Sequence, residues 1–234
     1  MQKKKHPRRK KLHRKEISNF NPALTPHLTH LWNERGVEDV SYQRQAQVTW
    51  WTILGGICVG ALLTQLPTLI TAINNGNWFY SLYFLATCLI VINSWVQTAW
   101  GSLVLKWPIT IPTSIFLFFQ GFSMSLAALN ITDSNNWYIA ISVVIFFAII
   151  NQVFFMKSEG WSSFPKKVVH RAKNGILVYI FIFVMTLIAS IHLTITDTTN
   201  VQIIWGMIGL VTACLALFWQ HLGMTEERKL MGIP

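Results

Sequence analysis

Long apolar runs separated by short polar segments occupy most of the chain after its first 47 residues. The longest stretch without a charged side chain lies between Arg44 and Lys106, and the polar sequence Asn74–Asn77 interrupts it near its centre. A membrane-spanning helix needs about 20 predominantly apolar residues, so this stretch is long enough for two. It therefore predicts a helical hairpin that crosses a bilayer and returns.

The same pattern recurs twice more and predicts an all-α, polytopic membrane protein with a bundle of six transmembrane helices arranged as three hairpins. The predicted spans are Val48–Ile73, Trp78–Leu103, Ile109–Leu129, Trp137–Met156, Gly175–Thr194 and Gln202–Gly223. Each is near the length that crosses the hydrocarbon core at a rise of about 1.5 Å per residue. This transmembrane domain, residues 48–223, lies between a largely disordered tail, residues 1–47, which could include an interfacial helix, and a short tail, residues 224–234.

Basic residues fall in alternate linkers and thereby predict the orientation. Lys106, the segment Lys157–Lys173 and Arg228 would lie on the same side as the first tail, whereas the other linkers carry at most one acidic residue, such as Asp133. Lys and Arg are retained on the cytoplasmic side of membranes. Six spans with both termini in the cytoplasm place every basic residue on that side.

Nine of the 19 Lys and Arg residues lie in the first tail between Lys3 and Lys15. Each basic residue near an anionic leaflet contributes about 1 kcal/mol of attraction, so the tail is predicted to bind anionic lipid headgroups. A tail that only fixes the topology is an equal alternative. Nucleic-acid binding is disfavoured, because no aromatic residue is interleaved and no binding fold surrounds the run. The predicted headgroup contacts are Lys3, Lys4, Lys5, Arg8, Arg9, Lys10 and Lys11.

Composition agrees with a membrane protein, since 52% of residues are hydrophobic and only 12% are charged, against roughly a quarter charged in soluble domains. Tryptophans lie near the predicted span ends, among them Trp78, Trp137 and Trp205. Indole rings settle at the level of the headgroups, so these three are predicted to face the outer interface. The three cysteines, all inside apolar runs, are interpreted as small hydrophobic residues.

No Asp, Glu, Lys or Arg lies deep in a predicted span. Proton-coupled transporters commonly keep an ionisable residue there, and paired carboxylates for acid–base catalysis are missing too. No nucleophile elbow, metal-binding motif or phosphate loop is found. We therefore expect neither an enzyme nor a bound cofactor or metal.

Uncharged polar side chains take the place of charges at membrane depth. Amides in hydrocarbon need partners, and interhelical hydrogen bonds are the simpler interpretation. The functional hypothesis is a shared polar cavity for an uncharged or weakly charged solute, lined by Gln65, Asn93, Gln120 and Asn151. Gly56 and Gly60, four residues apart in the first span, would let a second helix approach closely, which marks a face for packing or docking.

Two functions follow from these features. The first is a permeation, solute-binding or transport protein with an uncharged polar site between its helices. The alternative is a non-catalytic accessory subunit or assembly factor that docks onto a membrane complex through the first span and the basic tail. The predicted partners are the lipid bilayer, anionic headgroups, and either another membrane protein or further copies of the chain.

Overall fold

A computed structural model describes residues 37–103, 111–157 and 166–230 of the chain. These residues form six α-helices, and no strand occurs within the described ranges. The helices are α3 (Val37–Asn74), α4 (Tyr80–Leu103), α5 (Ile111–Leu129), α6 (Ser134–Lys157), α7 (Lys166–Ile195) and α8 (Thr199–Leu230).

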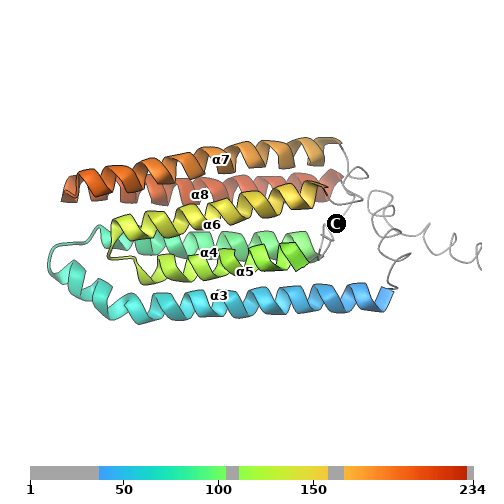
Figure 1. The fold of residues 1–234 in the computed structure, drawn as a ribbon, viewed down its shortest axis with the longest axis horizontal. Coiled ribbons are helices and arrows are strands. Elements are labelled where there is room, and N and C mark those ends of the chain that lie inside the picture. The colour runs from blue at the N-terminus through green and yellow to red at the C-terminus, as the bar shows by residue number, and fades with distance from the viewer. Residues whose placement is uncertain (1–36, 104–110, 158–165, 231–234) are drawn as a thin grey trace, which may run out of the picture.

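The helices form an elongated bundle in which successive helices run in opposite directions (Figure 1). One end, here named the turn end, holds the short connections at residues 75–79, 130–133 and 196–198. The other, named the terminal end, holds the start of α3 and the end of α8. Five helices are long and apolar enough to cross a membrane, and the apolar part of α5 is shorter, Ser114–Leu129.

Several helices extend past the predicted spans at the terminal end. α3 begins at Val37 and α7 at Lys166, and α8 continues to Leu230. Because backbone hydrogen bonds within a helix do not depend on the surrounding solvent, a helix can continue beyond the bilayer into charged sequence. Hydropathy alone therefore gave the apolar part of each helix but not its ends.

The turns are specified by local sequence. Gly76 has a φ of +88° and ends α3, because a left-handed residue is most easily adopted without a Cβ. The amide of Asn77 donates to the carbonyl of Ala72 (2.9 Å) and that of Gly76 to Ile73 (2.9 Å), which is a Schellman motif. Asp133 caps α6, as its carboxylate accepts from the backbone amide of Asn136 at 3.0 Å.

The helices pack side by side in a ring. α3 packs against α4 and α5, α5 against α6, α6 against α7, and α4 against α8. The ring is weakest between α7 and α8, which are consecutive in sequence but share few contacts. Two glycines allow close approaches: a Cβ at Gly121 would lie 3.0 Å from Leu54 of α3, and one at Gly206 would lie 3.1 Å from Tyr83 of α4.

The outward faces of the helices carry large apolar side chains, as a lipid-facing surface requires. Ile57 and Leu63 on α3, Phe122 on α5, Leu177 on α7 and Leu215 on α8 are all exposed on the isolated chain. A water-soluble protein rarely exposes apolar surface on this scale. The bundle is therefore suited to a lipid environment as a multi-pass membrane protein.

Candidate binding cavity

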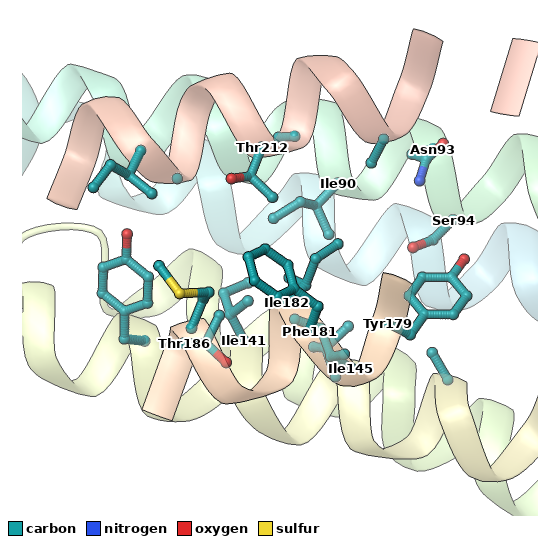
Figure 2. A pocket seen from close by; sticks show the side chains of 18 of the residues that line it. Ile90, Asn93, Ser94, Ile141, Ile145, Tyr179, Phe181, Ile182, Thr186 and Thr212 are labelled. Carbon is teal, nitrogen blue, oxygen red and sulfur yellow. The ribbon is translucent and has the colours of Figure 1, made fainter. Parts of the chain in front are cut away.

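A cavity of about 220 Å³ lies inside the bundle between α4, α6, α7 and α8, with one side chain from α5. Its lining residues recur every three or four positions along each helix, as in Ile141, Val144, Ile145 and Ala148 of α6, so each helix contributes one face. Most of the lining is aliphatic or aromatic. Side chains from α4, α6, α7 and α8 converge on the same space in Figure 2.

An aromatic layer closes the cavity toward the turn end. Trp137 and Tyr138 of α6 and Trp205 of α8 line it, and Tyr83 of α4 lies behind Trp137 with ring centroids 5.1 Å apart at an interplanar angle of 75°. The rings of Tyr138 and Trp205 also meet edge to face, 5.9 Å apart. Such edge-to-face pairs are favourable for aromatic quadrupoles.

Hydrogen bonds fix three rings of this aromatic layer, those of Trp137, Tyr138 and Tyr83. The indole N–H of Trp137 donates to Thr87 Oγ1 at 2.8 Å, and the hydroxyl of Tyr138 donates to the carbonyl of Trp205 at 2.5 Å. The hydroxyl of Tyr83 donates to the carbonyl of Gln202 at 2.7 Å. Because each polar atom of the three rings has a partner, the layer is bonded across α4, α6 and α8.

The position of two tryptophans differs from the prediction. Trp137 and Trp205 were expected at the outer headgroup level, but their side chains are only 1% and 7% exposed and lie in the aromatic layer. Trp78, in contrast, is exposed. The physical reason is that an indole near a helix end can point inward when a neighbouring helix offers an acceptor such as Thr87 Oγ1.

Polar side chains gather at the other end of the cavity. Asn93, Ser94 and Gln97 project from one face of α4, because their spacing matches a helical turn, and Gln120 projects from α5. Asn93 and Ser94 lie beside Tyr179 of α7 in Figure 2. The hydroxyl of Tyr179 donates to Gln97 Oε1 at 3.1 Å. We name Asn93, Ser94, Gln97 and Gln120 the polar cluster.

The seam between α7 and α8 is held near both ends and is weak between them. At the terminal end, Arg171 donates to the carbonyl of Trp219 at 2.7 Å and its guanidinium lies 5.5 Å from the centroid of the Trp219 ring. At the turn end, the indole N–H of Trp205 donates to His192 Nδ1 at 3.1 Å. These two clamps lie about 30 Å apart along α7 at 1.5 Å per residue.

The cavity is partly open to the outside of the bundle along this seam. Phe181 of α7 lines the cavity and is nevertheless 65% exposed, and Ile208 of α8 lines it with 37% exposure. Both side chains therefore stand between the cavity and the surface that faces lipid. Along α7, Phe181 lies between Arg171 and His192, where the seam is weak.

Two of the four predicted amides line the cavity and two do not. Asn93 and Gln120 are part of the lining. Gln65 is half-buried on α3, and α3 contributes no residue to the lining because it packs on the far side of α4 and α5. Asn151 is buried on α6, one helical turn beyond Ala148, the last α6 residue of the lining.

The other predicted sites lie away from the cavity. Gly56 and Gly60 are exposed, and a Cβ added to either meets nothing within 4 Å, so this face of α3 is open in the isolated chain. The predicted headgroup contacts from Lys3 to Lys11 lie outside the described residues. Within the described ranges, no three His, Cys, Asp or Glu side chains are grouped so that they could hold a metal ion.

The sequence did not single out Ser94, Gln97 or Tyr179 as site residues, although a signal was present. Asn93, Ser94 and Gln97 stand one and four residues apart, which places three polar side chains on one helical face within an apolar run. Tyr179 carries no such signal. Its role depends on α7 lying across the cavity from α4, which local sequence does not reveal.

Comparison of the chain with family models, with curated proteins and with solved structures finds no match.

Proposed function

We propose that this protein binds an uncharged, largely apolar small molecule that enters the cavity from the surrounding bilayer, between α7 and α8. The observation that carries the proposal is the cavity itself, apolar along most of its wall and open beside Phe181 on the lipid-facing side. Membrane-dissolved molecules reach such an opening by lateral diffusion. A dissolved ion would meet no charged side chain in the lining.

The size of the cavity limits the ligand. Its volume of about 220 Å³ exceeds the roughly 150 Å³ of an engineered apolar cavity that binds benzene and is below the about 300–1,000 Å³ typical of sites for drug-sized ligands. The site therefore suits a small hydrophobic molecule or the end of one hydrocarbon chain.

The aromatic layer favours binding over passage across the membrane. Trp137, Tyr138 and Trp205 lie between the cavity and the turn end, and hydrogen bonds hold them to α4 and α8. A solute crossing the bundle would have to displace this layer. Of the two functions predicted from the sequence, solute binding is thus the one we develop, with an uncharged ligand as expected from the absence of charge.

Photolabelling tests the proposal. The purified full chain in lipid nanodiscs is exposed to a medium-chain alkane that carries a diazirine, and the labelled residues are mapped by mass spectrometry. We expect labelling of Met185 and Ala213, which line the cavity from α7 and α8. Ala216 also lines it, so Ala216→Phe should fill the space and reduce labelling of Met185 and Ala213 several-fold.

The matched control is Leu215→Phe, because Leu215 is the neighbour of Ala216 but is exposed toward lipid and is not part of the lining. Labelling of Met185 and Ala213 should persist in this variant. If the alkane labels only the outward faces of the helices, or labels the cavity equally after Ala216→Phe, the proposed binding function is wrong.

A further inference from the structure

The polar cluster holds hydrogen-bonding groups that the described part of the protein does not satisfy. Ser94 and Gln120 are each more than nine-tenths buried, with 7% exposure, and line the cavity. The Oδ1 atom of Asn93 is fully buried without a hydrogen-bond partner, and Ser94 and Gln120 make no hydrogen bond within the described ranges. Buried polar groups in folded proteins are nearly always bonded.

Other side-chain hydroxyls near the cavity donate hydrogen bonds to backbone carbonyls of their own helices. Thr87 donates to the carbonyl of Tyr83 at 2.7 Å, and Ser142 donates to the carbonyl of Tyr138 at 2.8 Å. Thr186 donates to the carbonyl of Phe183 at 2.8 Å. Each of these side chains is satisfied by its own helix, whereas Ser94 is not. Within the described ranges, the unmet hydrogen-bonding capacity of the lining lies in the polar cluster and at the half-buried hydroxyl of Thr212 on α8.

From this arrangement we infer that the ligand carries one uncharged hydroxyl group, which the polar cluster binds, on a hydrocarbon body that lies along the apolar wall. This inference rests on the proposed function and adds the chemical class of the ligand. A hydroxyl both donates and accepts, so it can pair with Ser94 and with either side of the Asn93 or Gln120 amide. The body would extend past Ile182 and Met185 toward the aromatic layer.

The absence of charged side chains from the lining disfavours ligands with charged headgroups. No Asp, Glu, Lys, Arg or His is among the lining residues, so a carboxylate or a phosphate would lose its hydration without gaining a counter-charge. Amide and hydroxyl groups can replace water around a neutral hydroxyl at little cost. A medium-chain alcohol therefore fits the cavity better than a fatty acid or a phospholipid.

A comparison of two probes of equal length, each titrated separately, tests the inference. The same full chain in nanodiscs is labelled with a diazirine-bearing alkane or with the corresponding 1-alkanol, each across a range of concentrations. We expect the alkanol to half-saturate labelling of Met185 and Ala213 at about three- to tenfold lower concentration, since one or two net hydrogen bonds to neutral groups are worth a factor of this size.

Two variants test whether the preference for the alkanol depends on the polar cluster. Asn93→Leu and Gln120→Leu should each remove most of the advantage of the alkanol over the alkane, with alkane labelling of the same variant as the reference. Asn151→Leu is the matched control, because Asn151 is a buried amide outside the lining, and it should keep the full preference. Retained labelling by the alkane in the Asn93 and Gln120 variants also shows that the cavity still forms.

The outcomes separate this inference from the proposed function. If alkane and alkanol label Met185 and Ala213 with equal affinity, or if Asn93→Leu and Gln120→Leu keep the preference, the hydroxyl inference fails and cavity binding stands. If a fatty acid of the same length competes as well as the alkanol, the neutral headgroup is wrong. If neither probe reaches the cavity, both the proposed function and the inference are wrong.

Discussion

Tyr138 connects the aromatic layer to α8 at a point where two backbones come close. Its hydroxyl donates to the carbonyl of Trp205, and a Cβ added at Gly209 would lie 3.1 Å from the same hydroxyl oxygen. The ring of Trp137 would be the next neighbour, at 3.4 Å, which is an ordinary van der Waals distance. The side chain of Tyr138 therefore sets how large residue 209 can be.

A double-mutant cycle measures this dependence. Gly209→Ala carries a steric cost of about 1–2 kcal/mol, because adding a methyl group to a packed site forces the neighbours apart, and this cost offsets the roughly 1 kcal/mol by which alanine is favoured over glycine inside a helix. In a Tyr138→Phe background the hydroxyl is gone, so the same substitution should cost less, with a coupling of about 0.5–1 kcal/mol. Reversible unfolding in mixed micelles gives the free energies. Additive effects of the two substitutions would show that the hydroxyl does not limit residue 209.

At the scale of the helix, the Arg171 clamp joins two elements that otherwise scarcely touch. The guanidinium of Arg171 bonds to the carbonyl of Trp219, lies over its indole ring, and is 3.9 Å from the carboxylate of Glu226. It rests against Gly223, where an added Cβ would come within 1.4 Å of Nη2. The absence of a side chain at Gly223 is what lets the arginine cross onto α8.

Gly223→Ala should release this clamp. The new methyl group occupies the place of the guanidinium, and a flexible arginine side chain will move aside more readily than the backbone. We expect a broader distance distribution between spin labels at the exposed positions 177 of α7 and 215 of α8, measured by pulsed electron spin resonance.

Gly175→Ala is the control for the clamp, since Gly175 lies one turn from Arg171 on α7 and an added Cβ there meets nothing within 4 Å. Its distance distribution should match that of the unmodified chain. An unchanged distribution in Gly223→Ala would mean that other contacts hold the terminal end of the seam.

The helices themselves were predictable because their apolar runs are long and their turns carry local signals such as Asp133 and Gly76. Which face of each helix points inward was not predictable. Every face of a membrane helix is apolar. Hydropathy therefore does not tell that Asn93 faces the cavity and that Gln65 on α3 does not. That distinction arises only when α4 packs beside α8 and α3 on the far side.

At the scale of the whole molecule, the order of helices around the ring explains why the cavity lies where it does. α4 packs against α8 and α6 against α7, but α7 and α8 hardly touch. Consecutive helices in a bundle usually pack together because the connection between them is short. Here the short turn at residues 196–198 joins two helices that both line the cavity and share few contacts, and the space is closed at the turn end by residues of α6 and α8.

The orientation of the molecule in its membrane is a prediction that rests on charge. The terminal end carries the basic residues of α7 and α8, among them Lys166, Lys167 and Lys229, and the turn end carries Asp133 and Asp197. Basic residues are retained in the cytoplasm during insertion. The terminal end, with both chain termini, is therefore expected to be cytoplasmic, so that the polar cluster lies nearer the cytoplasm than the aromatic layer does.

Single cysteines in a chain whose native cysteines are replaced by alanine test this orientation. Asn75 and Thr198 are exposed at the turn end, and Lys166 is exposed at the terminal end. Ser134 is less suitable because its side chain is buried. A membrane-impermeant maleimide added to intact cells should label positions 75 and 198 and should label position 166 only after the membrane is permeabilised. Labelling of position 166 in intact cells, with positions 75 and 198 protected, would reverse the orientation and place the aromatic layer on the cytoplasmic side.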